Sequence, residues 1–323
     1  MEARTVRRGE PSVGARPTRM GGSMSACSLP GFIGIGAMKA GTTLLYELLR
    51  QHPDLQMAYG RKEVHFFDRH YDRGLSWYRS LFDDDREQLG GEITPNYLYD
   101  RRCPERIHEH VSDARLIVCL RDPVARAYSQ FTQWVRDAAY REDLPQFLDE
   151  HPNAVERGLY FEQLSRYLSL FPRDRPHVVI FEDFVADPLG QFDAICTFLG
   201  VPRFAEVRLP SGRVNATVRP RHGRAYAAAK KARAALYRRN VVWPVEAARR
   251  VGAVPVLLRP DRRVGFPPLP ASTSRHLREV YRPDVEQLSR LLGRDLVSLW
   301  GMDGEESAGS GAVRTVDLPA NNR

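Results

Sequence analysis

The sequence GFIGIGAMKAGTTLLYELLRQ, residues 31–51, joins an apolar strand, a glycine-rich turn and an amphipathic helix. Phe32, Ile33 and Ile35 form the β-prone run. Leucines then recur in pairs four residues apart, which predicts a helix with one apolar face. A strand, a glycine loop and a helix together favour anion binding, because bare backbone N–H groups and a helix N-terminus both attract negative charge.

The glycine spacing of this turn departs from that of a nucleotide-triphosphate loop. Gly36 and Gly41 match the two glycines of the GxxxxGK[ST] pattern, but Thr42 stands where the lysine belongs. The lysine is Lys39, inside the loop. We predict that the loop binds a phosphate or a phosphate-like group, with Thr42 and Thr43 as donors and Lys39 as a mobile cation. The alternative is a tight turn without a ligand.

Short strands and helices alternate along the rest of the sequence. Further strands are predicted at 55–58, 91–94, 116–120 and 177–181. The run at 116–120, LIVCL, is continuously apolar, which is typical of strands buried in parallel sheets. We therefore expect an α/β protein with a P-loop-type three-layer fold and a mainly parallel sheet of about five strands. Ligands should gather at the carboxyl ends of those strands.

Capping residues and prolines indicate where helices begin and end. Asp122 and Pro123 predict the start of a long helix, as N-cap and first helical residue. Near the C-terminus a helix is predicted over 272–281, with Pro283 interrupting it and starting a second helix.

Composition indicates a globular domain between two polar ends. The 323 residues are 42% apolar and 27% charged. We predict a disordered segment at 1–27, one domain at 28–302 and a disordered tail at 303–323. The first segment resembles neither a secretory signal nor a membrane anchor, and no apolar run approaches a bilayer span, so a cytoplasmic protein without a transmembrane segment is expected. The four cysteines have no zinc or disulfide spacing.

The charge is basic, with a net value of +8, and nearly all of it is arginine. Such a balance favours an anionic ligand, either a nucleotide or an acidic polymer. Nucleic acid is not expected, because the charge is dispersed and no nucleic-acid motif accompanies it. Only four residues are lysines, which makes Lys39 and Lys62 informative. The other two lie in a basic, Ala-rich stretch at 220–250, predicted as a solvated helix rather than a membrane-surface helix.

A second anion site is predicted at the run that begins with Arg121. This residue follows a strand, and Ser129 lies about two turns into the next helix. Arg126 and Ser129 are three residues apart and therefore share a helix face. A guanidinium and a hydroxyl at a strand end can clamp a phosphate, the alternative being a surface arginine and an ordinary helical serine. Asp122 is better explained by capping than by magnesium binding.

Two stretches, GFIGIGAMKAGTTLLYELLRQHP and LIVCLRDPVARAYSQF, resemble the signatures of the sulfotransferases that use 3′-phosphoadenosine-5′-phosphosulfate (PAPS). The first is similar to their 5′-phosphosulfate loop and the second to their 3′-phosphate site. EVHFF, at 63–67, resembles the branch that acts on sugars, including the heparan-sulfate enzymes. The likeness covers about residues 31–302, in the style of bacterial single-domain members without a membrane anchor.

The resemblance implies a binding role for particular residues. The 5′-phosphosulfate would be held by five consecutive residues, Lys39, Ala40, Gly41, Thr42 and Thr43. Arg121 and Ser129 would bind the 3′-phosphate. Arg219 and Arg221 are candidates for a lid over that phosphate, the alternative being a solvated basic loop.

The resemblance also implies that Glu63 is the general base and His65 its neighbour in the acceptor cleft. A carboxylate flanked by Arg61, Lys62 and His65 should stay ionised near neutrality. The alternatives are a surface acid in a charged loop and a histidine that only packs or hydrogen-bonds. Ile93 departs from the pattern, because some sugar enzymes have a lysine there, and this leaves the acceptor open.

The implied function is sulfuryl transfer from PAPS to a hydroxyl or amine of a sugar or glycosylated small molecule, without a metal. Adenosine 3′,5′-bisphosphate (PAP) would be released. A P-loop kinase or nucleotide hydrolase is the second hypothesis, but it needs a lysine directly after Gly41. A non-catalytic module that binds acidic glycans or membrane surfaces through residues 220–250 is the third.

Overall fold

The structure is a computed structural model that describes residues 29–303 except 60, 83–87, 139, 141 and most of 211–265. Within the last of these gaps, only 228 and 232 are described, and both are helical and exposed. The predicted disordered ends, most of the basic helix at 220–250, and the candidate lid residues Arg219 and Arg221 therefore lie outside the described residues.

Five parallel strands form a single sheet in the order β2-β3-β1-β4-β5. The strands are β1 (Phe32–Gly36), β2 (Leu55–Met57), β3 (Leu89–Ile93), β4 (Arg115–Leu120) and β5 (Pro176–Ile180). The predicted α/β class, the parallel sheet and the number of strands are confirmed. Each predicted strand is found within two residues of its expected bounds.

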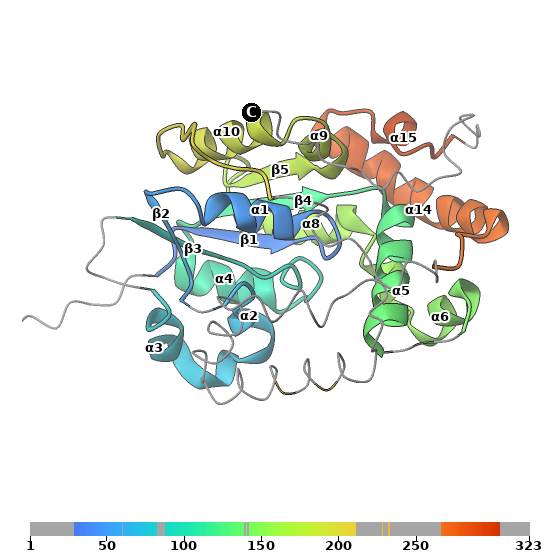
Figure 1. Ribbon diagram of the computed structural model, residues 1–323, viewed down its shortest axis with the longest axis horizontal. Helices are drawn as coiled ribbons and strands as arrows, with labels where there is room; N and C mark the ends of the chain where they lie inside the picture. Colours follow the sequence, from blue (N-terminus) through green and yellow to red (C-terminus); the bar gives the residue numbers. More distant parts are fainter. Residues whose placement is uncertain are drawn as a thin grey trace, which may run out of the picture.

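Helices cover both faces of the sheet, with α1 over one face and α8 over the other (Figure 1). The helices are α1 (Thr42–Leu49), α2 (Phe66–Arg69), the 3-10 helix η1 (Tyr71–Arg73), α3 (Gly74–Arg79), α4 (Cys103–Val111), α5 (Pro123–Ala138), α6 (Leu144–Glu150), α7 (Asn153–Glu156), α8 (Tyr160–Leu168), α9 (Phe181–Ala186), α10 (Pro188–Leu199), α14 (Ala271–Leu292) and α15 (Leu296–Leu299). No helix among the described residues combines the length and apolar character needed to cross a membrane.

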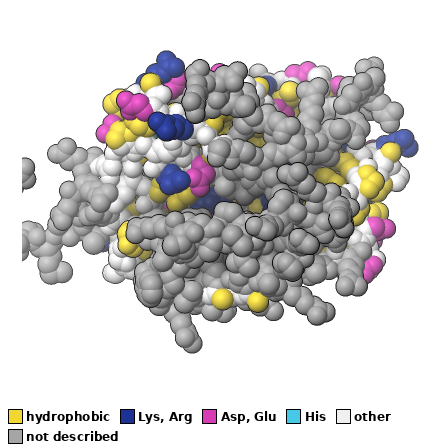
Figure 2. Space-filling view, in the orientation of Figure 1, with side chains coloured by type: hydrophobic (Ala, Val, Ile, Leu, Met, Phe, Trp, Pro, Cys, Tyr) yellow, Lys and Arg dark blue, Asp and Glu magenta, His cyan; other side chains and the backbone are white. Residues whose placement is uncertain are grey.

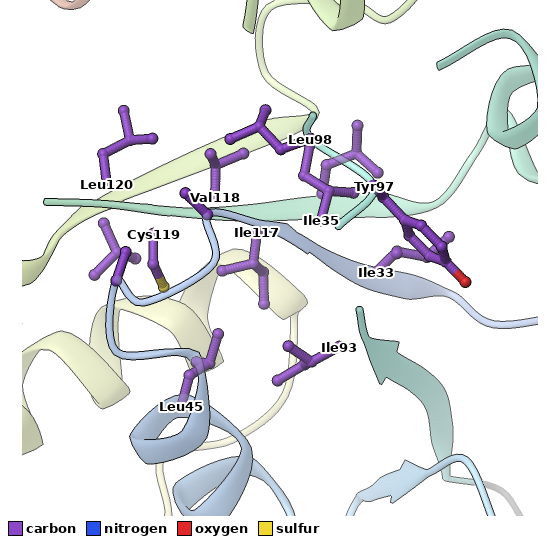
Figure 3. Packing of buried hydrophobic residues seen from close by; sticks show 14 of the residues in the cluster. Ile33, Ile35, Leu45, Ile93, Tyr97, Leu98, Ile117, Val118, Cys119 and Leu120 are labelled. Carbon is purple, nitrogen blue, oxygen red and sulfur yellow. The ribbon is translucent and has the colours of Figure 1, made fainter. Parts of the chain in front are cut away.

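The centre of the core lies around β4, whose side chains alternate between the two faces of the sheet. Ile117 and Cys119 point toward Leu45 on α1, whereas Val118 and Leu120 point to the opposite side (Figure 3). All four strand residues are fully buried, and Cys119 is a free thiol. A strand covered on both faces has to be apolar throughout, which explains the LIVCL run.

The helix near the C-terminus is continuous, so the predicted interruption at Pro283 is wrong. Helix α14 contains Pro283 in its interior. On either side of it, Tyr281 and Val285 are fully buried in the core. The Asp284 carboxylate accepts hydrogen bonds from the backbone N–H groups at the start of α8, at 2.7 and 3.1 Å. These tertiary contacts outweigh the hydrogen bond that the proline nitrogen cannot make.

Candidate active site

The segments that follow β1, β4 and β5 meet at the carboxyl edge of the sheet. Ala37 N, just after β1, donates to Cys119 O at 2.6 Å. Arg121 Nη1, just after β4, donates to Lys39 O at 3.3 Å, and its guanidinium lies 4.5 Å from the centre of the Phe181 ring after β5. The glycine loop and Arg121 are therefore brought together as the topology predicted.

The backbone of the glycine loop turns tightly into α1. Lys39 and Gly41 have φ values of 72° and 88°, in the left-handed region. A Cβ at Gly41 would lie 2.8 Å from the Phe181 ring, so this position requires glycine for both its conformation and its space. Ala40 and Thr42 are buried. The loop thus delivers the backbone N–H groups at the start of α1 to one small region.

Lys39 lies among other cations. Burial, together with the charges of Arg136, Arg121 and Lys62, lowers the pKa of Lys39 to about 8, against an opposing effect of Asp137. Repulsion between neighbouring cations is relieved when an anion binds among them. The loop and its surroundings therefore fit a phosphate or phosphosulfate group.

The second predicted anion site lies at the end of β4 and the start of α5, where Arg121 and Ser129 remain its predicted residues. Ser129 is half-buried on α5, and its hydroxyl makes no hydrogen bond within the described part of the chain. Arg126, one turn earlier, is fully buried; it donates to Gln130 Oε1 at 2.9 Å and also to Ala154 O. Arg126 shares a helix face with Ser129, as expected, but its guanidinium is held inside the protein by these contacts with Gln130 and α7.

Asp122 caps α5, as predicted. Its Oδ1 accepts from Val124 N at 2.9 Å, and burial raises the pKa of Asp122 to about 6. A carboxylate engaged in capping a helix is a poor magnesium ligand, which counts against an NTPase site here. Across the described residues, no group of three His, Cys, Asp or Glu side chains is arranged to hold a metal ion.

On the other side of the glycine loop, a chain of hydrogen bonds orders Glu63 and His65. His65 Nε2 lies 3.3 Å from Glu63 Oε2, and His65 Nδ1 lies 2.9 Å from Asp68 Oδ2. Asn96 Nδ2 donates to the same Asp68 oxygen at 2.7 Å. Lys62 Nζ lies 3.3 Å from Glu63 Oε1. The carboxylate of Glu63 is thus held between a lysine and a histidine.

The electrostatics of this group fix its protonation states. Burial lowers the pKa of His65, but hydrogen bonds to Asp68 and Glu63 outweigh it and raise the pKa to about 9. Burial raises the pKa of Glu63, but the His65 hydrogen bond and the Lys62 charge lower it to about 2. Near neutral pH, Glu63 is therefore ionised, as predicted, and His65 is an imidazolium that donates from both nitrogens.

The backbone of this segment is held by side chains at the end of β3. Thr94 Oγ1 accepts from Val64 N at 3.0 Å and donates to Glu92 Oε2 at 2.6 Å. Tyr97 OH accepts from Phe66 N at 2.8 Å and donates to Glu92 Oε1 at 3.0 Å. The peptide N–H groups on both sides of His65 are therefore satisfied by side chains from the turn that follows β3.

This supporting network was not predicted from the sequence. Glu92 is fully buried, and burial raises the pKa of its carboxyl, which also accepts from Tyr78 OH at 2.7 Å. Two signals were available. Asp68 follows His65 by one helical turn, and the TPNY turn places Thr94 directly after a strand.

Lys62 connects the glycine loop to the segment that carries Glu63 and His65. Lys62 Nζ donates to Thr43 Oγ1 at 2.8 Å, which connects the first turn of α1 to the segment that carries Glu63. Ile93, the position at which a lysine is absent, is fully buried. On the described part of the face seen in Figure 2, basic side chains lie beside acidic ones rather than forming one basic field.

The fold and the site together define an α/β enzyme with a loop for an anionic donor and a carboxylate beside it. A family model described as a sulfotransferase domain matches residues 30–216. Human heparan sulfate glucosamine 3-O-sulfotransferase 6 is 34% identical over 277 residues, which cover 83% of this chain and 72% of that protein. The chain therefore belongs to the sulfotransferase family, and the predicted class of PAPS-dependent sulfotransferase is confirmed.

Other relatives share a shorter region. Human heparan sulfate glucosamine 3-O-sulfotransferase 3B1 is 39% identical over 188 residues, which cover 54% of this chain and 47% of that protein, so the match spans about half the length of that relative. The crystal structure of a sulfotransferase from Alicyclobacillus acidocaldarius superimposes with a TM-score of 0.61 at 26% identity, covering 85% of this chain and 99% of that one.

Proposed function

We propose that the protein transfers a sulfuryl group from PAPS to a hydroxyl or amine of a sugar-containing acceptor. One observation carries the proposal. The hydrogen bonds of Lys62 join Thr43, at the donor loop, to Glu63, the carboxylate suited to be the base. The donor-binding loop and the base are thus connected by one short chain of contacts, and an in-line transfer requires the two to be close.

The donor side is assigned to the glycine loop and to Arg121. The 5′-phosphosulfate would be held by five consecutive residues, Lys39, Ala40, Gly41, Thr42 and Thr43. Lys39 neutralises the charge that develops on the leaving phosphate oxygen. Arg121 and Ser129 hold the 3′-phosphate, and Arg219 and Arg221 are proposed to close over it. When bound, PAPS supplies a sulfuryl group on a good leaving group.

The acceptor side is assigned to Glu63 as general base, with His65 and Asp68 as its supports. An ionised carboxylate can accept the acceptor proton, whereas an imidazolium cannot. His65, held by Asp68, therefore orients Glu63 rather than acting as a base itself. Its side chain is 17% exposed and that of Glu63 is 39% exposed, so the carboxylate is the more open of the two.

The acceptor class is inferred from the relatives. Two of them are named as enzymes that modify glucosamine in heparan sulfate. We infer that an amino sugar or a related glycoside is the acceptor, and that residues 28–302 form the catalytic domain.

Cys103, Cys119 and Cys196 are free thiols, which supports a reducing, cytoplasmic location.

The test is a transfer assay with PAPS and a panel of acceptors, with products detected by mass spectrometry. The panel should contain glucosamine oligosaccharides, simple glycosides and non-sugar alcohols. We expect sulfated sugar products and stoichiometric PAP. In thermal-shift measurements PAP should raise the Tm, while Mg-ATP should not. Phosphorylated products from Mg-ATP, or no product from PAPS with any acceptor, would contradict the proposal.

A further inference from the structure

The ammonium group of Lys62 lies between the donor loop and the base. Its Nζ is 2.8 Å from Thr43 Oγ1 and 3.3 Å from Glu63 Oε1. The side chain is 25% exposed, so it is partly desolvated but open on one side. An ammonium has three N–H donors. Two of them have acceptors among the described residues, which leaves one for a ligand oxygen.

The neighbouring cations are occupied by other contacts. Arg121 donates to Lys39 O at 3.3 Å and stacks over an aromatic ring. Arg136 pairs with Asp137 at 2.8 Å. Ile93, at the end of β3, is buried and apolar. Within the described part of the chain, Lys62 contacts both the donor loop, at Thr43, and Glu63.

The presence of a lysine at position 62 also favours contact with a ligand. This chain has 44 arginines and four lysines, so a lysine at 62 is unusual for its composition. A lysine carries a compact charge on a flexible stem, whereas an arginine presents a planar fork that suits a carboxylate or phosphate. A mobile point charge is suited to a group that moves from one oxygen to another.

We propose that Lys62 binds an oxygen of the sulfuryl group during its transfer, as a second cation beside Lys39. The inference rests on the proposed function and deepens it, because it assigns the recognition of the transferred group to a residue outside the glycine loop.

The transfer step shows what such a cation does. The acceptor oxygen forms a bond to sulfur while the bond between sulfur and the 5′-phosphate oxygen breaks. The bonding electron pair stays on the phosphate, next to Lys39, and the acceptor proton goes to Glu63. The sulfuryl oxygens remain anionic throughout, and Lys62 donates to one of them.

The position of Lys62 also couples the donor to the base. Without donor, Lys62 and His65 keep the pKa of Glu63 near 2, against the effect of burial, and so keep this carboxylate a weak base. As Lys62 shifts toward a sulfuryl oxygen, it leaves Glu63, whose basicity rises. PAP has no sulfuryl group, so it should not draw Lys62 away from Glu63.

The experiment compares Lys62→Met and Lys62→Gln with Lys62→Arg. Arg50→Met is the matched control, because Arg50 lies at the exposed end of α1 and pairs with Glu47 at 2.6 Å. For each variant, kcat and KM for PAPS, the Kd of PAP and the Tm are measured. The pH profile of kcat/KM for PAPS is recorded for wild type and Lys62→Met.

In the two neutral variants we expect kcat to fall by about 10²-fold. PAP affinity should stay within about threefold of wild type, with Lys62→Arg intermediate and the Arg50 control unchanged. The acidic limb of the kcat/KM profile, which reports the free enzyme, should move to higher pH, because Glu63 without Lys62 has a higher pKa and is protonated earlier on acidification.

The inference is overturned if the neutral variants retain kcat within about threefold, or if PAP affinity falls as much as kcat does. The second result would place Lys62 on the phosphate instead of the sulfuryl group. Absence of PAPS turnover in wild type counts against the proposed function. If the wild type turns over PAPS and the Lys62 variants keep its kcat, the role of Lys62 is contradicted and the proposed function is not.

Discussion

The two halves of the site are held in place in different ways. The donor loop, residues 37–43, is fixed by backbone hydrogen bonds: Ala37 N donates to Cys119 O on β4, and Ala40 N donates to Ala37 O at 3.3 Å. The acceptor loop, residues 61–68, is fixed by side chains from about thirty residues away, chiefly Thr94 and Tyr97. The first half is held mainly through its backbone and the conformation of its glycine turn, and the second depends on distant side chains.

Because of this difference, nucleotide binding and the chemical step should respond differently to substitutions in the two halves. A change in the donor loop should impair both nucleotide binding and turnover. A change in the support of the acceptor loop should impair turnover and leave nucleotide binding intact. Four variants or conditions test this separation.

Lys39→Ala should have the largest effect, because it removes the cation at the leaving oxygen. We expect kcat to fall by about 10³-fold or more and PAP binding to weaken. Steady-state kinetics and calorimetry measure the two quantities. Lys39→Arg keeps the charge and is the control for its loss. A Lys39→Ala enzyme with normal turnover would remove Lys39 from the mechanism.

Thr94→Val should disturb the acceptor loop and leave the donor loop intact. The isosteric change leaves Val64 N and His65 N without their acceptor, so unfolding should become easier by about 1–3 kcal/mol. Turnover should fall by about tenfold through misplacement of Glu63, with PAP affinity unchanged. Denaturant unfolding and kinetics measure these effects.

Thr197→Val is the matched control for Thr94→Val, since the Thr197 hydroxyl donates to Asp193 O within α10. It should leave kcat unchanged. Equal losses of turnover in both variants would mean that the end of β3 has no special role in placing the acceptor loop.

PAP affinity should depend on pH through Lys39. Its pKa of about 8 means that Lys39 is charged below pH 8 and loses its charge as the pH rises. Above that value, the Kd of PAP should rise by up to about tenfold per pH unit, and binding should take up protons. Calorimetry in buffers of different ionisation enthalpy measures both. In Lys39→Arg this dependence should disappear, and a flat wild-type profile would contradict the assignment.

Asp68→Asn should give the smallest change in turnover but a clear change in titration. The carboxylates of Asp68 and Glu63 hold the pKa of His65 at about 9 against the effect of burial. Without the Asp68 charge, the pKa of His65 should fall toward its ordinary value of about 6.5. NMR titration of the imidazole nitrogens measures this, and an unchanged pKa would show that Asp68 does not support His65.

The same contrast explains how much the sequence predicted. Three features have local signals in the sequence and were predicted. They are the strand at Phe32–Gly36, the glycine loop and the capped start of α5 at Asp122. Burial of Arg126 against α7 and the uninterrupted α14 depend on partners that are distant in sequence. For that reason the sequence predicted that Glu63 would be ionised but did not predict how Thr94 and Glu92 hold its loop.

The measurement that tests the central claim most directly is single-turnover sulfuryl transfer by Glu63→Gln, with donor and acceptor saturating. Glutamine keeps the shape of the side chain but cannot accept the proton. We predict that the rate of the chemical step falls by about 10²- to 10⁴-fold while the Kd of PAP stays at its wild-type value. An unchanged single-turnover rate would contradict the assignment of Glu63 as base, and an equal loss of PAP binding would contradict the separation of the two halves.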